Sequence, residues 1–318
     1  MAVEYFMVFG YFLISMAIGA FCIGAAIDIW KTTKEGNANH SSVRISSLAA
    51  TISLPLVILG ITSTLFHLGR MDRFYNIIME PGSWLTREAW SAGLFTACSF
   101  IYFLLWRRSA TFQEPSRQRA IMETAATSQE SSRQRVIIGA VGIILGITAI
   151  LSMSMIYSTV KAIPAWNTTL IFYMNLSNAF ALGVFLLGLI LAFDYSKAKA
   201  EGKPKILTQL RSFTGFGLLA IVLIGVTYFT YQAQIAMLPQ VSGMVVKSTT
   251  GLLSARIILG ILIPLVIIAY AWLNSIKKPS FMPIALVSSF VLVVAGDIMA
   301  RMLHFLIAVQ PPVIPPIF

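Results

Sequence analysis

One stretch of the sequence, residues 64–90, brings together side chains that exchange protons. It contains a histidine, His67, and an acid, Glu88, together with the arginines Arg70 and Arg87. A histidine takes up or releases a proton near neutral pH, and a carboxylate in a partly dry pocket can do the same. These groups suit the two oxygens of a quinone and the protons released when a quinol is oxidised. From the residues alone they suit the binding site of a transporter equally well.

A second set of polar residues lies near the C-terminus. Asp297, Arg301 and His304 are spaced i, i+4 and i+7, which puts them on one face of a helix. A charge at the centre of a membrane helix costs on the order of 2.5 to 3.5 kcal/mol, so this face must point into protein. Two interpretations stay open: a functional site, or a neutral Asp297–Arg301 pair that only holds the bundle together. His304 is close enough to the predicted membrane surface to be wetted, and Asp28 is interpreted as an interfacial cap near Lys31.

The composition identifies the elements that must position these residues. Of the 318 residues, 57% are apolar or aromatic and 11% are charged, and the mean hydropathy is +0.81. Such a chain is neither a soluble globular domain nor disordered. Apolar runs long enough to cross a hydrocarbon core of roughly 30 Å recur along it. The sequence predicts an all-α, polytopic membrane protein, a single domain over residues 1–318, with eight transmembrane helices at about residues 5–30, 45–66, 89–106, 136–157, 168–193, 212–238, 252–274 and 282–309.

The basic residues predict the orientation of these helices. Loops one, three, five and seven contain 16 of the 23 Lys and Arg residues. By the positive-inside rule these loops are cytoplasmic, so both termini are predicted on the non-cytoplasmic side. The longest of them, residues 107–135, is predicted to be a solvated cytoplasmic loop. The net charge of +11 therefore concerns topology, and no nucleic-acid partner is predicted.

The cysteines limit what the chain can hold by itself. Cys22 and Cys98 are the only two, and both lie in apolar runs. Neither a disulfide framework nor a four-thiolate iron-sulfur site can be built from them. No metal site is predicted, and any iron-sulfur cluster must belong to a partner chain.

Several motifs resemble those of a known family. HLGR at residues 67–70, followed by SWLTRE at residues 83–88, resembles the membrane anchor subunit of the bacterial dimethyl sulfoxide reductase family, a DmsC-like chain related to the NrfD-type anchors of polysulfide reductases. The segment YSTVKAIPAW at residues 157–166, Ala255–Ile257 and GDIMAR at residues 296–301 are also similar to that family. Together these motifs extend over nearly the whole chain.

The resemblance implies a function, partners and site residues. It implies an anchor that oxidises menaquinol, contains no haem and holds an iron-sulfur subunit and a molybdopterin catalytic subunit on the non-cytoplasmic face. The setting implied is anaerobic electron transport in the bacterial cytoplasmic (inner) membrane, between the quinone pool in the lipid bilayer and a terminal substrate that this chain does not itself reduce. The family's catalytic histidine and glutamate fall on His67 and Glu88, and the remaining quinol-binding residues expected here are Arg70, Arg87, Asp297, Arg301 and His304. Two departures are an aspartate at Asp297, one methylene shorter than the family's acid, and His304 with Phe305 where the family has Phe-Tyr.

Two alternatives from other classes remain open at this point. A secondary transporter would have broken helices in two corresponding halves. Pro55 and Pro264 interrupt two predicted spans, but no pairing of halves follows from the sequence. A haem b membrane subunit could use His67 and His304 as axial ligands, although a second haem needs two more membrane histidines and His40 lies in a loop.

Overall fold

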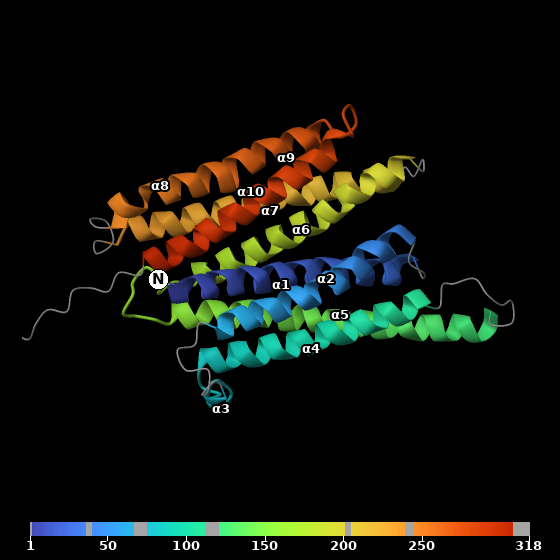
Figure 1. The fold of residues 1–318 in the computed structure, drawn as a ribbon, viewed down its shortest axis with the longest axis horizontal. Coiled ribbons are helices and arrows are strands. Elements are labelled where there is room, and N and C mark those ends of the chain that lie inside the picture. The colour runs from blue at the N-terminus through green and yellow to red at the C-terminus, as the bar shows by residue number, and fades with distance from the viewer. Residues whose placement is uncertain are drawn as a thin grey trace, which may run out of the picture.

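The chain folds as a bundle of long helices (Figure 1). The computed structural model describes residues 2–35, 40–66, 75–111, 121–200, 205–238 and 245–307, and these ranges contain no strand. Eight helical stretches within them are long and apolar enough to cross a membrane, which confirms the predicted number. The elements are α1 Ala2–Glu35, α2 His40–Leu65, α3 Asn76–Met79, α4 Trp84–Thr111, α5 Ile121–Ser158, α6 Leu170–Ala200, α7 Lys205–Ala236, α8 Val245–Ile257, the π-helical segment η2 Ile258–Leu262, α9 Ile263–Leu273 and α10 Phe281–Leu306.

Hydropathy locates the membrane helices because the bilayer leaves the backbone no other partners. Every N–H and C=O in hydrocarbon must be bonded within the chain, and a helix does this locally. Most helices extend several residues beyond their predicted spans, and the largest extension is in segment 107–135. The described parts of segment 107–135 are helical, since α4 continues to Thr111 and α5 begins at Ile121. This segment is rich in Ala, Gln and Glu, which favour helix without any apolar periodicity.

The helices form two groups of four with the same order of neighbours. In the N-terminal bundle, α1 and α4 each contact both α2 and α5. In the C-terminal bundle, α6 contacts α7 and α10, and α9 contacts the same two helices. Figure 1 shows the two bundles one above the other in that view. The two halves of the chain therefore have corresponding arrangements of helices, although no such correspondence could be seen in the sequence.

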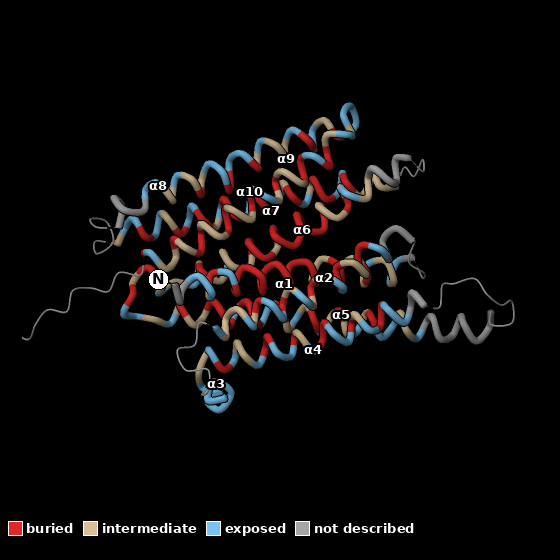
Figure 2. Tube along the Cα trace, in the orientation of Figure 1, coloured by how far each residue is buried: buried red, intermediate tan, exposed pale blue. Residues whose placement is uncertain are grey.

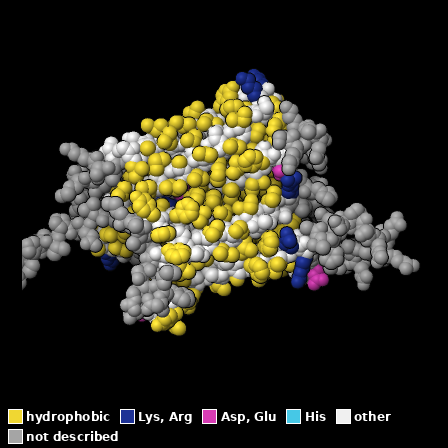
Figure 3. All heavy atoms as spheres, in the orientation of Figure 1, with side chains coloured by type: hydrophobic (Ala, Val, Ile, Leu, Met, Phe, Trp, Pro, Cys, Tyr) yellow, Lys and Arg dark blue, Asp and Glu magenta, His cyan; other side chains and the backbone are white. Residues whose placement is uncertain are grey.

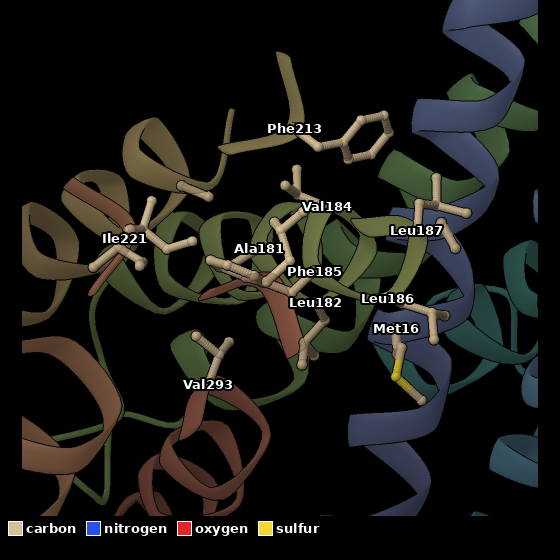
Figure 4. Close-up of a cluster of buried hydrophobic side chains, with 14 of the residues drawn as sticks. Met16, Ala181, Leu182, Val184, Phe185, Leu186, Leu187, Phe213, Ile221 and Val293 are labelled. Atoms are coloured by element: carbon tan, nitrogen blue, oxygen red, sulfur yellow. The ribbon is translucent and has the colours of Figure 1, made fainter. Parts of the chain in front are cut away.

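The two bundles meet where α1 crosses α6. A side chain on Gly19 of α1 would collide with the backbone of Ala179 on α6, and one on Gly183 would collide with the backbone of Gly19. Small residues of this kind let two membrane helices approach closely. Buried residues run along both helices in Figure 2, and Figure 4 shows Met16 of α1 beside Leu186 of α6 at the edge of the apolar core.

The bundle has two distinct ends. α1 begins and α10 ends at the same end, which also carries α3, and we call it the outer end (Figure 1). The loops that the charge pattern predicts to be cytoplasmic lie at the other end, the inner end. Figure 3 shows a surface covered by apolar side chains, with most of the visible Lys and Arg toward the inner end. This distribution is what a membrane-spanning bundle requires.

The two prolines that raised the transporter alternative have different surroundings. Pro55 lies inside α2, which continues through it. Pro264 follows η2 at the start of α9. Proline lacks an N–H and crowds the carbonyl four residues earlier, and a local π turn accommodates both defects. Only one of the two spans is irregular at its proline.

Candidate functional site

Asp297 and Arg301 form an ion pair inside the protein. The Arg301 Nε atom lies 2.7 Å from Asp297 Oδ2, and both side chains are buried. The second arm of Arg301 donates from Nη2 to the hydroxyl of Ser15 on α1, at 2.9 Å. The polar face of α10 therefore points at the junction between the two bundles, as its spacing predicts.

His304 lies one further turn toward the outer end, in an aromatic enclosure. Its ring stacks on Trp166, with 5.2 Å between centroids and 12° between planes. Tyr157 of α5 meets the same ring edge-on at 4.8 Å. Trp166 also donates from its indole nitrogen to the His304 carbonyl oxygen, at 2.8 Å. The Nε2 atom of His304 is buried and has no hydrogen-bond partner. The expectation that this imidazole is wetted at the membrane surface is therefore wrong.

Glu88 is connected to His304 by the side chains of two tyrosines, Tyr11 and Tyr157. The Tyr11 hydroxyl of α1 donates to Glu88 Oε2 at 3.4 Å. The Tyr11 ring in turn meets the Tyr157 ring edge-on, 6.2 Å between centroids. Tyr157 also contacts His304. A carboxyl from α4, phenols from α1 and α5 and an imidazole from α10 thus converge at the outer end of the bundle junction.

Arg87 does not join this group. It is exposed, its guanidinium lies 4.5 Å from the centroid of the Trp84 ring, and its Nε donates to the Pro81 carbonyl at 3.1 Å. Successive residues on a helix point about 100° apart, so Glu88 faces inward where Arg87 faces outward. Of the arginine and acid that stand next to each other in the sequence, the structure brings only the acid to the site.

The two remaining predicted residues of this region, His67 and Arg70, lie outside the described residues. The last described residue before them is Phe66. Its ring packs against Phe6 near the start of α1, 5.8 Å between centroids.

Three members of the site were not found from the sequence. Tyr11 and Ser15 lie in an apolar run, four residues apart, and meet their partners only because α1 packs against α5 and α10 and Tyr11 reaches Glu88 on α4. Tyr157 stands beside a predicted membrane surface, where aromatic residues are common without any function. The one available signal was the i, i+4 spacing of Tyr11 and Ser15, which places two hydroxyls on one helix face.

The interpretation of Asp28 as an interfacial cap near Lys31 is wrong. Asp28 is 3% exposed, and its Oδ2 atom accepts from the Tyr102 hydroxyl at 3.0 Å and from Arg135 Nε at 3.4 Å. The Arg135 guanidinium also lies 4.4 Å from the centroid of the Trp106 ring. Tyr102 of α4 and Arg135 of α5 thus enclose this carboxylate at the inner end of the bundle.

The residues at the outer end can do acid–base chemistry on a bound molecule. We call them the outer polar cluster: Tyr11, Ser15, Glu88, Tyr157, Asp297, Arg301 and His304. Together they offer a carboxyl, hydroxyl donors and a buried imidazole nitrogen that has no hydrogen-bond partner. Among the described residues, no three His, Cys, Asp or Glu side chains are placed to hold a metal ion.

Fold and site together define a multi-pass helical membrane protein with a polar site between two bundles at one end of the helices. Residues 4–313 match the family described as Polysulphide reductase, NrfD, and the chain belongs to that family. No curated protein matches the sequence significantly. The match confirms an NrfD-type anchor, and the narrower assignment to dimethyl sulfoxide reductase stays a prediction.

Family membership gives the general role of the chain. NrfD proteins are membrane subunits of polysulphide and molybdoenzyme reductase complexes, and they generally partner with iron-sulfur and molybdoenzyme subunits. The chain is therefore a transmembrane anchor of a reductase complex, as the resemblance implies.

Proposed function

We propose that the anchor oxidises a quinol at the outer polar cluster and passes the electrons to an iron-sulfur partner docked on the outer end. The observation that carries the proposal is the convergence of Glu88, Tyr11, Tyr157 and His304 from four helices on one partly buried position. Acid–base groups placed together and shielded from water are what quinol oxidation needs, because each hydroxyl must give up a proton. In line with the resemblance, the quinol is menaquinol.

Each residue of the cluster has a role in this reaction. Oxidation of a quinol to a quinone releases two protons and two electrons. Glu88 accepts one proton, and the Tyr11 hydroxyl holds its carboxylate in place. His67 binds the other quinol oxygen and accepts the second proton, a role carried over from the resemblance. Asp297 and Arg301 fix the charges around the pocket.

The electrons leave by the outer end in this proposal. The iron-sulfur subunit and the molybdopterin subunit dock there, on the non-cytoplasmic face of a bacterial inner membrane, and the terminal substrate is reduced in the molybdopterin subunit. The support is the charge pattern, which puts the Lys-rich and Arg-rich loops at the opposite end.

The test compares two glutamates at the same end of the molecule. Glu88→Gln removes the proton acceptor, whereas Glu80→Gln changes an exposed glutamate next to α3 and serves as the matched control. We expect Glu88→Gln to lower quinol-dependent reduction about a hundredfold or more, the usual contribution of a general base. Reduction by the same complex with an artificial electron donor is expected to be unchanged, because that route bypasses the quinol.

His67→Gln is expected to behave like Glu88→Gln, and Glu80→Gln like the unaltered chain. An equal loss with quinol and with the artificial donor would show that Glu88 holds the complex together, and the proposal would be abandoned.

A further inference from the structure

Arg256, the penultimate residue of α8, is as deeply buried as Asp297, and these two are the most deeply buried charges in the C-terminal bundle among the described residues. Arg256 is 1% exposed, and its Nε and Nη1 atoms are buried without a hydrogen-bond partner. Its guanidinium lies 5.4 Å from the centroid of the Tyr228 ring on α7. The Tyr228 hydroxyl is itself buried without a partner. Unpaired polar atoms of this kind are expensive inside a membrane, so they indicate a function.

Two glycines make the space that Arg256 occupies. Gly260 lies four residues further along the chain, in η2, and Gly296 lies opposite on α10. A Cβ atom on either glycine would collide with Arg256 Nη1. Helix α10 and the segment formed by α8 and η2 therefore pack closely around the guanidinium, and Arg256 lies at the contact between them.

Arg256 stands beside the ion pair of α10. Its Nη1 atom lies against Gly296, the residue that precedes Asp297, so the charges of Asp297 and Arg301 both act on it. Asp297 uses Oδ2 for Arg301, and its Oδ1 is buried without a partner. We call Arg256, Asp297 and Arg301 the charge triad. One carboxylate cannot neutralise two guanidinium groups, so the triad carries a net charge of +1.

The charge triad shares Asp297 and Arg301 with the outer polar cluster, and Arg256 is its one additional member. Arg301, its outermost member, lies three residues before His304 on α10, and the His304 ring contacts Tyr157. The groups that face Arg256 itself are Tyr228 from α7 and the two triad partners from α10. Glu88 lies further away, across Tyr11 and Tyr157. The excess positive charge is therefore on the α10 side of the site, and the carboxyl that takes the proton is on the α4 side.

We propose that Arg256 is a positioning residue of the quinol site: it keeps the charge triad at a net charge of +1, which stabilises negative charge on the quinol oxygen as its proton leaves for Glu88. This inference rests on the proposed function. The O–H bond breaks, the proton goes to the Glu88 carboxylate, and the electron pair stays on the oxygen as quinolate until oxidation. Fixed cations near a developing anion in a dry site favour this step strongly.

The experiment measures how strongly the site prefers an anion. Two inhibitor probes of nearly the same shape are 2-hydroxy-1,4-naphthoquinone, which is an anion at neutral pH, and its neutral methyl ether, 2-methoxy-1,4-naphthoquinone. Their dissociation constants are measured on the full chain, purified with its partner subunits, by quenching of tryptophan fluorescence, and displacement by quinol shows that they share its site. The ratio of the two constants is the readout.

Four variants test the role of the charge. Arg256→Met is expected to reduce the preference for the anionic probe on the order of tenfold, the effect of a unit charge roughly 10 Å away at an effective dielectric constant of about 20. Arg256→Lys is expected to keep the preference, since the charge remains. Asp297→Asn is expected to increase it, because the triad then carries +2. Lys161→Met, which removes an exposed charge between α5 and α6, is expected to leave it unchanged.

The outcomes separate the two proposals. If neither probe is displaced by quinol in the unaltered protein, the proposed function is wrong and the inference with it. If the probes compete with quinol but Arg256→Met weakens both equally, Arg256 is only a packing residue and the inference alone is overturned. Should Arg256→Met fail to assemble, an unchanged ratio in assembled Asp297→Asn overturns it just as directly.

Discussion

Removing the two members of the α10 ion pair one at a time is expected to have unequal effects. In a simple ion pair, removing either partner leaves one buried charge, so the two substitutions cost similar amounts of stability. Here Asp297 has a second arginine beside it, Arg256, and an oxygen atom that is not yet used. Arg301→Gln therefore leaves a carboxylate and a guanidinium that can neutralise each other. Asp297→Asn leaves two buried guanidinium groups with no carboxylate.

The magnitudes follow from burial and from the 2.7 Å contact. Breaking a buried pair by removing one partner costs about 3 to 5 kcal/mol. We expect Asp297→Asn to lower the free energy of unfolding by an amount at or above the upper end of that range, because it leaves two buried guanidinium groups without a carboxylate. Arg301→Gln should cost about 1 to 3 kcal/mol, chiefly for the unpaired hydroxyl of Ser15 and the lost contact. The stability cost of the double variant should fall between those of the two single variants, since only Arg256 is left without a partner.

The assay is thermal unfolding of the purified complex in detergent, together with turnover per assembled complex with quinol. Asp194→Asn is the control, because it removes the same kind of carboxylate from the exposed ion pair with Arg44, where a cost of about 0 to 1 kcal/mol is usual. Equal losses from Asp297→Asn and Arg301→Gln would refute the charge triad. Full quinol turnover in an assembled double variant would leave the ion pair as structural support, and both residues would be withdrawn from the quinol site.

Two further predictions concern the orientation of the bundle and its inner end. Accessibility tags at both termini are expected to report the non-cytoplasmic side and a tag within residues 112–120 the cytoplasm, because the basic loops lie inside; a cytoplasmic C-terminus would contradict the charge argument. Asp28→Asn is expected to lower the unfolding temperature of the complex more than Asp194→Asn does, because the carboxylate it removes pairs with Arg135 out of contact with solvent. Its quinol turnover per assembled complex is expected to be unchanged, and a selective loss of turnover would instead place Asp28 in the reaction.

The sequence was sufficient for whatever depends on a single helix. The eight spans follow from hydropathy, because the bilayer enforces helices locally. The contact between Asp297 and Arg301 follows from helix geometry, because residues four apart on one helix are neighbours. Glu88 could be selected because it lies with His67 and several arginines at the predicted membrane edge and because the resemblance places the family's glutamate there.

What the sequence could not supply is the packing between helices. Tyr11 and Glu88 are 77 residues apart, and Arg301 and Ser15 are 286 residues apart, so no local pattern connects them. The misreading of Asp28 has the same cause. Its partners, Tyr102 on α4 and Arg135 on α5, lie 74 and 107 residues away; Tyr102 was expected within a span, and Arg135 at the end of a solvated loop. Each of these contacts depends on how helices cross, which glycines such as Gly19 determine.

Helix α1 contributes residues both to the outer polar cluster and to the buried contact of Asp28 with Tyr102 and Arg135 at the inner end. Tyr11 and Ser15 belong to the outer polar cluster, and Asp28 to the inner end. Between Ser15 and Asp28 the helix has no side chain with an oxygen or nitrogen atom, over a rise of about 20 Å. Helix α1 therefore offers no proton path to the inner end, and in the proposed reaction a proton accepted by Glu88 leaves by the outer end, where the electrons also pass to a partner. Because both leave on one side, the oxidation moves no net charge across the membrane, and this is why turnover should be indifferent to Asp28 while stability is not.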